Sequence, residues 1–118
     1  MSITNDDTVF FTYSDTVTKI TEYIAKNLTV ELSYRRIAEA FHLSEKYLYK
    51  LFKKEVGVTL SQYVLERRIV KAQTVLNAGG TAGEASLSAG FGDYSVFYRC
   101  FVRETGLTPS EYVRASKK

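Results

Sequence analysis

Three of the four lysines and one of the two tyrosines between residues 45 and 56 have the chemistry of a nucleic-acid contact. If this stretch is helical, Lys46, Lys50 and Lys53 share an arc of roughly 60° at about 100° per residue, with Tyr49 beside them. Lysine ammonium groups neutralise phosphates, and polar or aromatic side chains on such a helix reach base edges in the major groove. On these residues alone, a solvated surface helix explains the pattern equally well.

The neighbouring residues predict the helix itself. Ser44 is a typical N-cap residue, and Gly57 suits a helix end in the left-handed conformation. Leu48, Leu51 and Phe52 recur at the spacing of one buried helical face, opposite the lysines. The stretch is therefore expected to bury a narrow apolar back and to expose a basic front.

The chain repeats this pattern 49 residues later. Residues 51–64 align with residues 100–113, and seven of the fourteen positions are identical. The second copy has Asp93 as its N-cap, Phe97, Cys100 and Phe101 as its back, and Ser95, Tyr98 and Arg99 as its front. Two similar exposed polar faces on one small chain indicate a surface that recognises a partner whose structure repeats in space.

Length and composition limit the possible architectures. The 118 residues suffice for one domain, or for two very small ones that share a core. Apolar residues make up 45% and charged residues 25%, as in ordinary globular proteins. No run approaches the ~18 apolar residues of a membrane span, and the N-terminus lacks a signal-peptide pattern. The single cysteine excludes an intrachain disulfide and fits a reducing cytoplasm, where we expect the protein.

The net charge of +3 is unevenly distributed. Residues 1–31 have a net charge of −3, whereas residues 32–118 have a net charge of +6. A basic body of this size suits a polyanionic partner, although many inert proteins are equally basic.

Helical periodicity and capping signals extend through most of the chain, and no alternating strand pattern is seen. Capping-box patterns start at Thr59, Thr81 and Thr108, the last with Pro109 at the favoured first position. About seven helices are expected, at residues 15–27, 34–41, 45–56, 60–78, 82–89, 94–105 and from 109 onward. The predicted fold class is all-α, with a short helix, a tight turn and a polar-fronted helix occurring twice.

This order divides the chain into four parts. Residues 1–13 are expected to be a tail, or the stub of a linker to an upstream domain. Residues 14–58 are expected to form one helix-turn-helix subdomain, residues 59–79 a linker helix, and residues 80–116 a second helix-turn-helix subdomain. The predicted inner stripe of the linker helix consists of Leu65, Ile69, Ala72 and Leu76.

An ordered set of motifs spreads over these parts. Its members are Ile37-Ala38, Leu43-Ser44, Tyr47-Leu48, Leu51-Phe52-Lys53-Lys54, Gly57, Arg68-Ile69, Ala72, Val75-Leu76, Gly90-Phe91, Asp93, Ser95, Phe97, Arg99, Phe101, Gly106, Thr108-Pro109-Ser110 and Tyr112. This combination resembles the DNA-binding domain of the AraC/XylS family over about residues 15–115. The resemblance implies two helix-turn-helix units joined by one long helix, each with a recognition helix in the major groove of double-stranded DNA. It also implies a transcription regulator, usually an activator.

Position on the two fronts and the resemblance together predict the DNA contacts. A 19-residue linker of about 28 Å, with its flanking turns, suits recognition helices separated by one DNA turn of ~34 Å. Expected base contacts are Lys46, Tyr49, Lys50, Tyr94, Ser95, Val96 and Arg99, with Val96 suited to a thymine methyl group. Expected phosphate contacts are Lys53, Lys54, Arg68 and Arg103, although a merely solvated role for Lys54 and Arg103 stays open.

The chain departs from the family pattern at two places. Ala85-Ser86 stands where the family commonly has Ile-Ala, so the scaffold helix before the second turn is expected to pack less well. Gly83 in the same helix costs up to ~1 kcal/mol of helix propensity. Val96 stands where the family often has an aromatic residue.

Enzymatic and cofactor functions have little support in the sequence. His42 is the only histidine and lies in a turn, and Cys100 lies on an inner face between two phenylalanines. We therefore expect no enzyme, no cofactor and no metal. The competing hypothesis is a helical protein-interaction module that docks an acidic partner, such as an RNA polymerase subunit. This chain is expected to be a monomer, with dimerisation dependent on an upstream domain.

Overall fold

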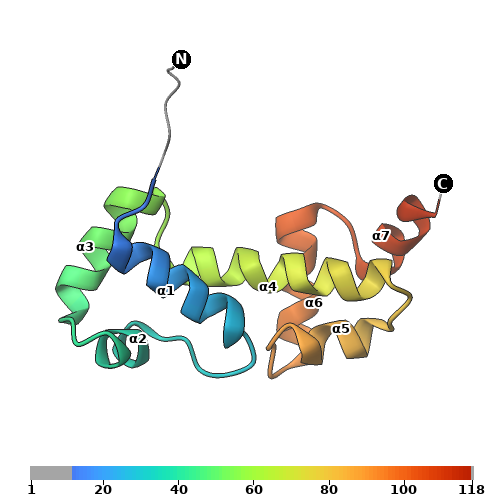
Figure 1. Cartoon of the computed structure of the whole chain (residues 1–118). Helices are drawn as coiled ribbons and strands as arrows, with labels where there is room; N and C mark the ends of the chain where they lie inside the picture. Colours follow the sequence, from blue (N-terminus) through green and yellow to red (C-terminus); the bar gives the residue numbers. More distant parts are fainter. Residues whose placement is uncertain (1–11, 118) are drawn as a thin grey trace, which may run out of the picture.

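The computed structural model describes residues 12–117, and every regular element within them is an α-helix. The helices are α1 (Asp15–Lys26), α2 (Tyr34–Ala40), α3 (Glu45–Val56), α4 (Leu60–Asn77), α5 (Ala82–Ser88), α6 (Tyr94–Thr105) and α7 (Pro109–Ser116) (Figure 1). The predicted all-α class is confirmed, and the first six predicted helices match to within one residue at each end. The prediction for residues 1–13 falls almost entirely outside the described residues.

Each of the seven helices begins at a side-chain oxygen that accepts a backbone N–H of its first turn. The N-cap residues are Ser14, Ser33, Ser44, Thr59, Thr81, Asp93 and Thr108. Thr81 and Thr108 form the complete capping boxes that the sequence predicts.

The capping box predicted at Thr59 is only half formed. The Thr59 hydroxyl accepts the backbone N–H of Gln62 at 3.1 Å. The Gln62 side-chain oxygen does not accept the Thr59 backbone N–H, and the amide nitrogen donates instead to Glu66 at 3.0 Å and to Glu104 of α6 at 3.3 Å. A tertiary contact has replaced the second half of the local motif.

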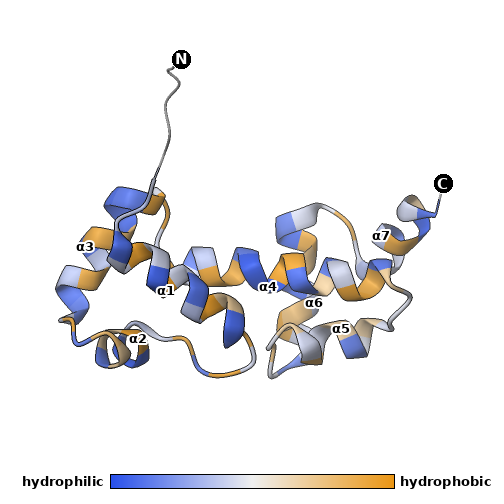
Figure 2. Cartoon of the chain, in the orientation of Figure 1, coloured by the Kyte–Doolittle hydropathy of each residue, from blue (hydrophilic) through white to orange (hydrophobic). Residues whose placement is uncertain are grey.

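The apolar side chains gather into two cores. Figure 2 shows hydrophobic and hydrophilic residues alternating along the helices that supply them. The first consists of Val17, Ile20, Ile24, Leu32, Ile37, Ala38, Leu48, Phe52, Leu60 and Val64. The second consists of Ile69, Ala72, Leu76, Ala85, Ala89, Phe91, Phe97 and Phe101. Only α4 contributes buried residues to both cores, so it is the element that joins the two units.

The two ends of α4 are buried on different sides. Leu60 and Val64 enter the first core, whereas Ile69, Ala72 and Leu76 enter the second. At 100° per residue, the mean directions of these two sets differ by about 130° around the helix axis. The four residues of the inner stripe predicted for this helix all pack in the second core, so that prediction is confirmed, whereas the second face, which enters the first core, was not predicted.

Matching residues of the repeat make matching contacts. The ring of Tyr63 meets Phe52 edge to face at 5.3 Å between centroids, and Tyr112 meets Phe101 in the same way at 5.6 Å. Both tyrosines therefore pack against the recognition helix of their own unit. Burial also raises the pKa of the Tyr63 phenol.

The scaffold helix α5 lies close against α4, and the prediction that its small residues pack less well stays a prediction. Ala85, Ser86 and Ala89 are buried, and α5 contacts α4 more extensively than any other pair of helices does. The small side chains of α5 allow the backbones of the two helices to approach closely.

Three glycines allow a direct test of how the recognition helices end. Gly57 and Gly106 adopt φ of 94° and 80°, and a Cβ at either position meets nothing within 4 Å. Replacing either with alanine should lower the free energy of unfolding by about 1–2 kcal/mol through backbone strain alone. Gly92 has equal space but no positive φ, so Gly92→Ala is the control and should be neutral or slightly stabilising. Chemical denaturation of the three variants measures this, and equal effects at all three positions would contradict it.

Candidate nucleic-acid interface

The front of α3 is fully available to a ligand. Lys46, Tyr49, Lys50 and Lys53 are exposed, while Leu48 on the opposite side is completely buried. The Ser44 hydroxyl accepts the backbone N–H of Tyr47 at 3.1 Å and so fixes the start of this helix. The structure thus brings the predicted basic residues of the first unit onto one exposed face.

Tyr49 is held in place by a second tyrosine. Its ring lies against Tyr34 of α2 at 5.8 Å between centroids. The Tyr34 hydroxyl in turn accepts the backbone N–H of Leu60, the first residue of α4, at 3.1 Å. The first recognition helix is therefore connected through one aromatic pair to the start of the linker helix.

The front of α6 is equally open. Tyr94, Ser95, Val96 and Arg99 are exposed. The Asp93 carboxylate accepts the backbone N–H groups of Ser95 at 2.7 Å and Val96 at 3.3 Å, which sets the first turn of the helix. The predicted base contacts of the second unit consequently also share one exposed face.

Tyr98 belongs to this surface although it was not among the predicted base contacts. It is 41% exposed, and its ring lies 6.5 Å from that of Tyr94. In the 49-residue repeat it is the counterpart of Tyr49, which is 46% exposed. A strict transfer along the repeat is the signal that would have selected it.

The two recognition helices run in similar directions. In Figure 1 both α3 and α6 extend from the bottom of the view to the top, at different points along α4. The 18 residues of α4 span about 27 Å at ~1.5 Å per residue. A single chain therefore carries two exposed polar fronts, on helices at different points along α4.

The predicted phosphate contacts have different surroundings. Lys53 and Lys54 are exposed in the last turn of α3. Arg103 is exposed on α6 but forms an ion pair with Glu104 at 3.3 Å. The Arg103 side chain is 63% exposed, so the arginine side of this pair is open to solvent, whereas the Glu104 side chain is only 20% exposed.

Arg68 lies in a place that the sequence did not indicate. Its Nε donates to the carbonyl oxygen of Leu28 at 3.1 Å, and its Nη2 donates to that of Val30 at 3.0 Å. Burial lowers the pKa of its guanidinium group. One edge of its guanidinium is thus used inside the molecule, and the phosphate role predicted for Arg68 stays a prediction.

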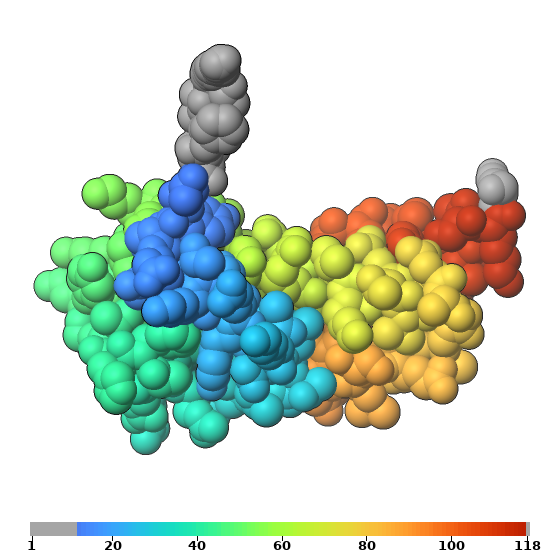
Figure 3. Space-filling model, viewed as in Figure 1, coloured from blue at the N-terminus to red at the C-terminus, as the bar shows by residue number. Residues whose placement is uncertain are grey.

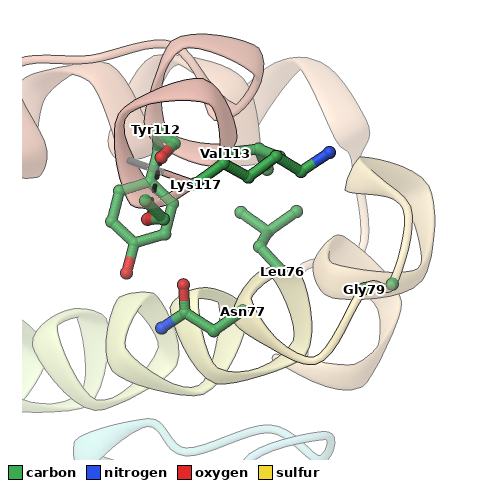
Figure 4. Close-up of a pocket in the computed structure, with 8 residues that line it drawn as sticks. Leu76, Asn77, Gly79, Tyr112, Val113 and Lys117 are labelled. Carbon is green, nitrogen blue, oxygen red and sulfur yellow. Dashed lines mark hydrogen bonds between the residues drawn. The ribbon is translucent and has the colours of Figure 1, made fainter.

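A surface pocket of about 520 Å³ lies between the end of α4 and α7 (Figure 4). Figure 4 shows the Tyr112 hydroxyl beside the Asn77 amide on one side of it, with Leu76 to their right and the Lys117 side chain above Leu76. Across residues 12–117, no group of three or more histidine, cysteine, aspartate or glutamate residues is placed to hold a metal ion. Nor is any helix in that range long and apolar enough to cross a membrane.

Comparison with known proteins agrees with this geometry. A family model described as a helix-turn-helix domain matches residues 37–115. The bifunctional transcriptional activator/DNA repair enzyme AdaA of Bacillus subtilis is 33% identical over 105 residues, covering 88% of this chain and 50% of that protein. The transcriptional activator RhaR of Cronobacter sakazakii is 32% identical over 87 residues, covering 73% of this chain and 31% of that protein. The C-terminal domain of AraT, a response regulator from Geobacillus stearothermophilus, superposes with a TM-score of 0.84 at 25% identity, covering 87% of each chain.

The chain belongs to the AraC/XylS family of helix-turn-helix transcription regulators, and its described residues form the DNA-binding domain of that family. The chain spans half or less of the length of the two curated relatives.

Proposed function

We propose that this chain binds an asymmetric double-stranded DNA site as a monomer, with α3 and α6 in successive major grooves, and activates transcription from it. The observation that carries the proposal is the pair of exposed polar fronts, repeated 49 residues apart and joined by one helix. Residues 14–58 and 80–116 are the two DNA-reading units, and residues 59–79 set their separation. A protein that reads chromosomal DNA shares its compartment, which is the cytoplasm in bacteria.

The proposed contacts fall into two groups. Base contacts are assigned to Lys46, Tyr49, Lys50, Tyr94, Ser95, Val96 and Arg99, with Tyr98 added on the basis of the structure. Phosphate contacts are assigned to Lys53, Lys54 and Arg103. Lysine and arginine contacts to guanine edges specify sequence, whereas contacts to phosphates fix position and make the affinity depend on salt.

Activation further requires contact with the transcription machinery. We propose RNA polymerase as a protein partner, supported by relatives that are named as transcriptional activators. Dimerisation would depend on residues outside the described helices.

The proposal is tested by binding to random duplex DNA at two salt concentrations, followed by selection and footprinting of a preferred site. We expect binding that weakens steeply with salt, and a footprint of about 20 base pairs, or two turns of ~10.5 base pairs. Failure to bind any duplex would favour a protein-interaction module instead. A footprint of half that length, or an obligatory palindrome bound by two chains, would contradict the monomeric two-groove arrangement.

Arg99 and Arg103 separate base recognition from phosphate binding. Arg99→Ala should cost about 1–3 kcal/mol on the preferred site and relax the preference at one base pair, with little effect on scrambled DNA. Arg103→Ala should weaken all duplexes alike and reduce the salt slope by about one. Salt titrations on cognate and scrambled duplexes measure both effects. An equal loss on both duplexes for Arg99→Ala would show that this residue only binds phosphate.

A break in α4 should separate the two units. Val70 is 43% exposed in the middle of this helix, so Val70→Pro removes little packing while it interrupts the backbone hydrogen bonds. Affinity for the full site should fall toward that of one unit, because the second contact is no longer held at the correct separation. Val70→Ala is the matched control and should bind as the wild type does. Full-site affinity that survives a break verified by circular dichroism would contradict the role of α4 as a rigid spacer.

A further inference from the structure

The two helix-turn-helix units touch each other directly, beside the linker helix that joins them. The segment after α1, residues 27–33, lies next to the turn between α5 and α6, residues 89–93, and Figure 3 shows the two segments in contact at the surface. Arg68 of α4 reaches this junction. Its direction around the α4 axis falls between the two buried faces of that helix, at 100° per residue.

Arg68 holds the first unit by two hydrogen bonds from one edge of its guanidinium. These bonds reach the carbonyl oxygens of Leu28 and Val30 at 3.1 and 3.0 Å. Both carbonyls follow the C-terminal end of α1, where a cation is favourable. The planar guanidinium serves both acceptors at once, and a lysine ammonium has no matching fork.

At Gly90, the second unit lies directly against the carbonyl group of Leu28. Its φ is 94°, and a Cβ at this position would lie 1.8 Å from the oxygen of Leu28 and 3.1 Å from Nε of Arg68. The obstacle is backbone, so no side-chain movement relieves it. Gly90 therefore permits a contact between the units that no other residue type allows.

The turn between α2 and α3 in the first unit shows that a positive φ at this place does not by itself require glycine. His42 occupies the same place between α2 and α3 and adopts φ of 57°. Both turns close with the same hydrogen bond, from Leu43 to Ala38 at 2.9 Å and from Phe91 to Ser86 at 3.0 Å. A side chain is accepted in the first turn, whereas at Gly90 the approach of Leu28 excludes it.

We propose that Arg68, the Leu28 and Val30 carbonyls and Gly90 form a clamp that fixes the rotation of one DNA-reading unit relative to the other. Arg68 is thus a positioning residue, and the clamp makes the protein selective for the spacing between its two half-sites. The inference deepens the proposed function, and its DNA-binding test rests on that function.

The first experiment needs no DNA. Spin labels at Lys50→Cys and Ser95→Cys, both exposed, report the distance between α3 and α6 in a Cys100→Ala background. The labelled protein with the native Arg68 and Gly90 should give one narrow distribution of distances between the two spin labels. Arg68→Lys keeps the charge but loses the fork, and should broaden the distribution about twofold or more, as expected when a small interface between units is lost. Arg67→Lys, the same change at the exposed neighbouring position, is the control and should leave the width unchanged.

Gly90→Ala provides an independent route to the same outcome. Its control is Gly57→Ala, which introduces the same strain at an identical φ of 94° but meets nothing within 4 Å. Circular dichroism should show equal helix content in both variants. Only Gly90→Ala should broaden the distance distribution, because only that methyl group separates the units.

The second experiment varies the preferred duplex by adding or removing one or two base pairs between its halves. The wild type should lose about tenfold or more in affinity, because each base pair rotates one half-site relative to the other. Arg68→Lys should lose less than about threefold over the same series. A wild-type distance distribution and an unchanged spacing profile in Arg68→Lys would overturn the clamp. If the wild type binds no duplex, the proposed function fails, while the distance measurement still decides the clamp.

Discussion

The structure depends on one constraint, which is that α4 must bury its two ends in two different cores. Leu60 and Val64 point into the first core, and Ile69, Ala72 and Leu76 into the second. Since an α-helix is stiff and advances by 100° per residue, these burial directions determine how the two units are rotated about their common axis. Neither core is large, and each loses apolar contact if α4 turns. The hydrophobic effect that folds each unit therefore also orients it.

Each of the two units oriented in this way contributes one recognition helix, α3 or α6, with an exposed polar face. Each recognition helix begins at a capped residue, ends at a glycine in the left-handed conformation and packs its central phenylalanine against a tyrosine. The exposed side of each recognition helix therefore takes no part in packing. Residues on that side can therefore differ between the two copies, lysine-rich in α3 and mixed in α6, without a cost to the fold.

Local signals predicted most of the fold, and long-range contacts account for what they missed. Caps at Ser44, Asp93 and Thr108 act within a few residues, so helix boundaries and the all-α class followed from the sequence. The change of face within α4 did not, because one periodicity was fitted to a helix that serves two cores. The contact from Arg68 to Leu28 spans forty residues, and no local pattern encodes it. The predicted base contacts all lie on exposed fronts, whereas their roles toward DNA stay predictions.

The energetics of a two-part DNA contact explain why such a junction matters. Once one recognition helix is bound, the second binds at an effective concentration set by how narrowly its position is restricted. A stiff helix restricts the separation of the two units. A single helix between small cores, however, resists rotation of one unit relative to the other less well than a helix that is supplemented by a second contact between the units. The two hydrogen bonds of Arg68 and the close approach at Gly90 supply that second point, beside α4 and between its two buried faces. Rotational restriction costs nothing at binding if it already exists in the free protein, so ordered contacts between the two units contribute to the affinity for a site of matching spacing.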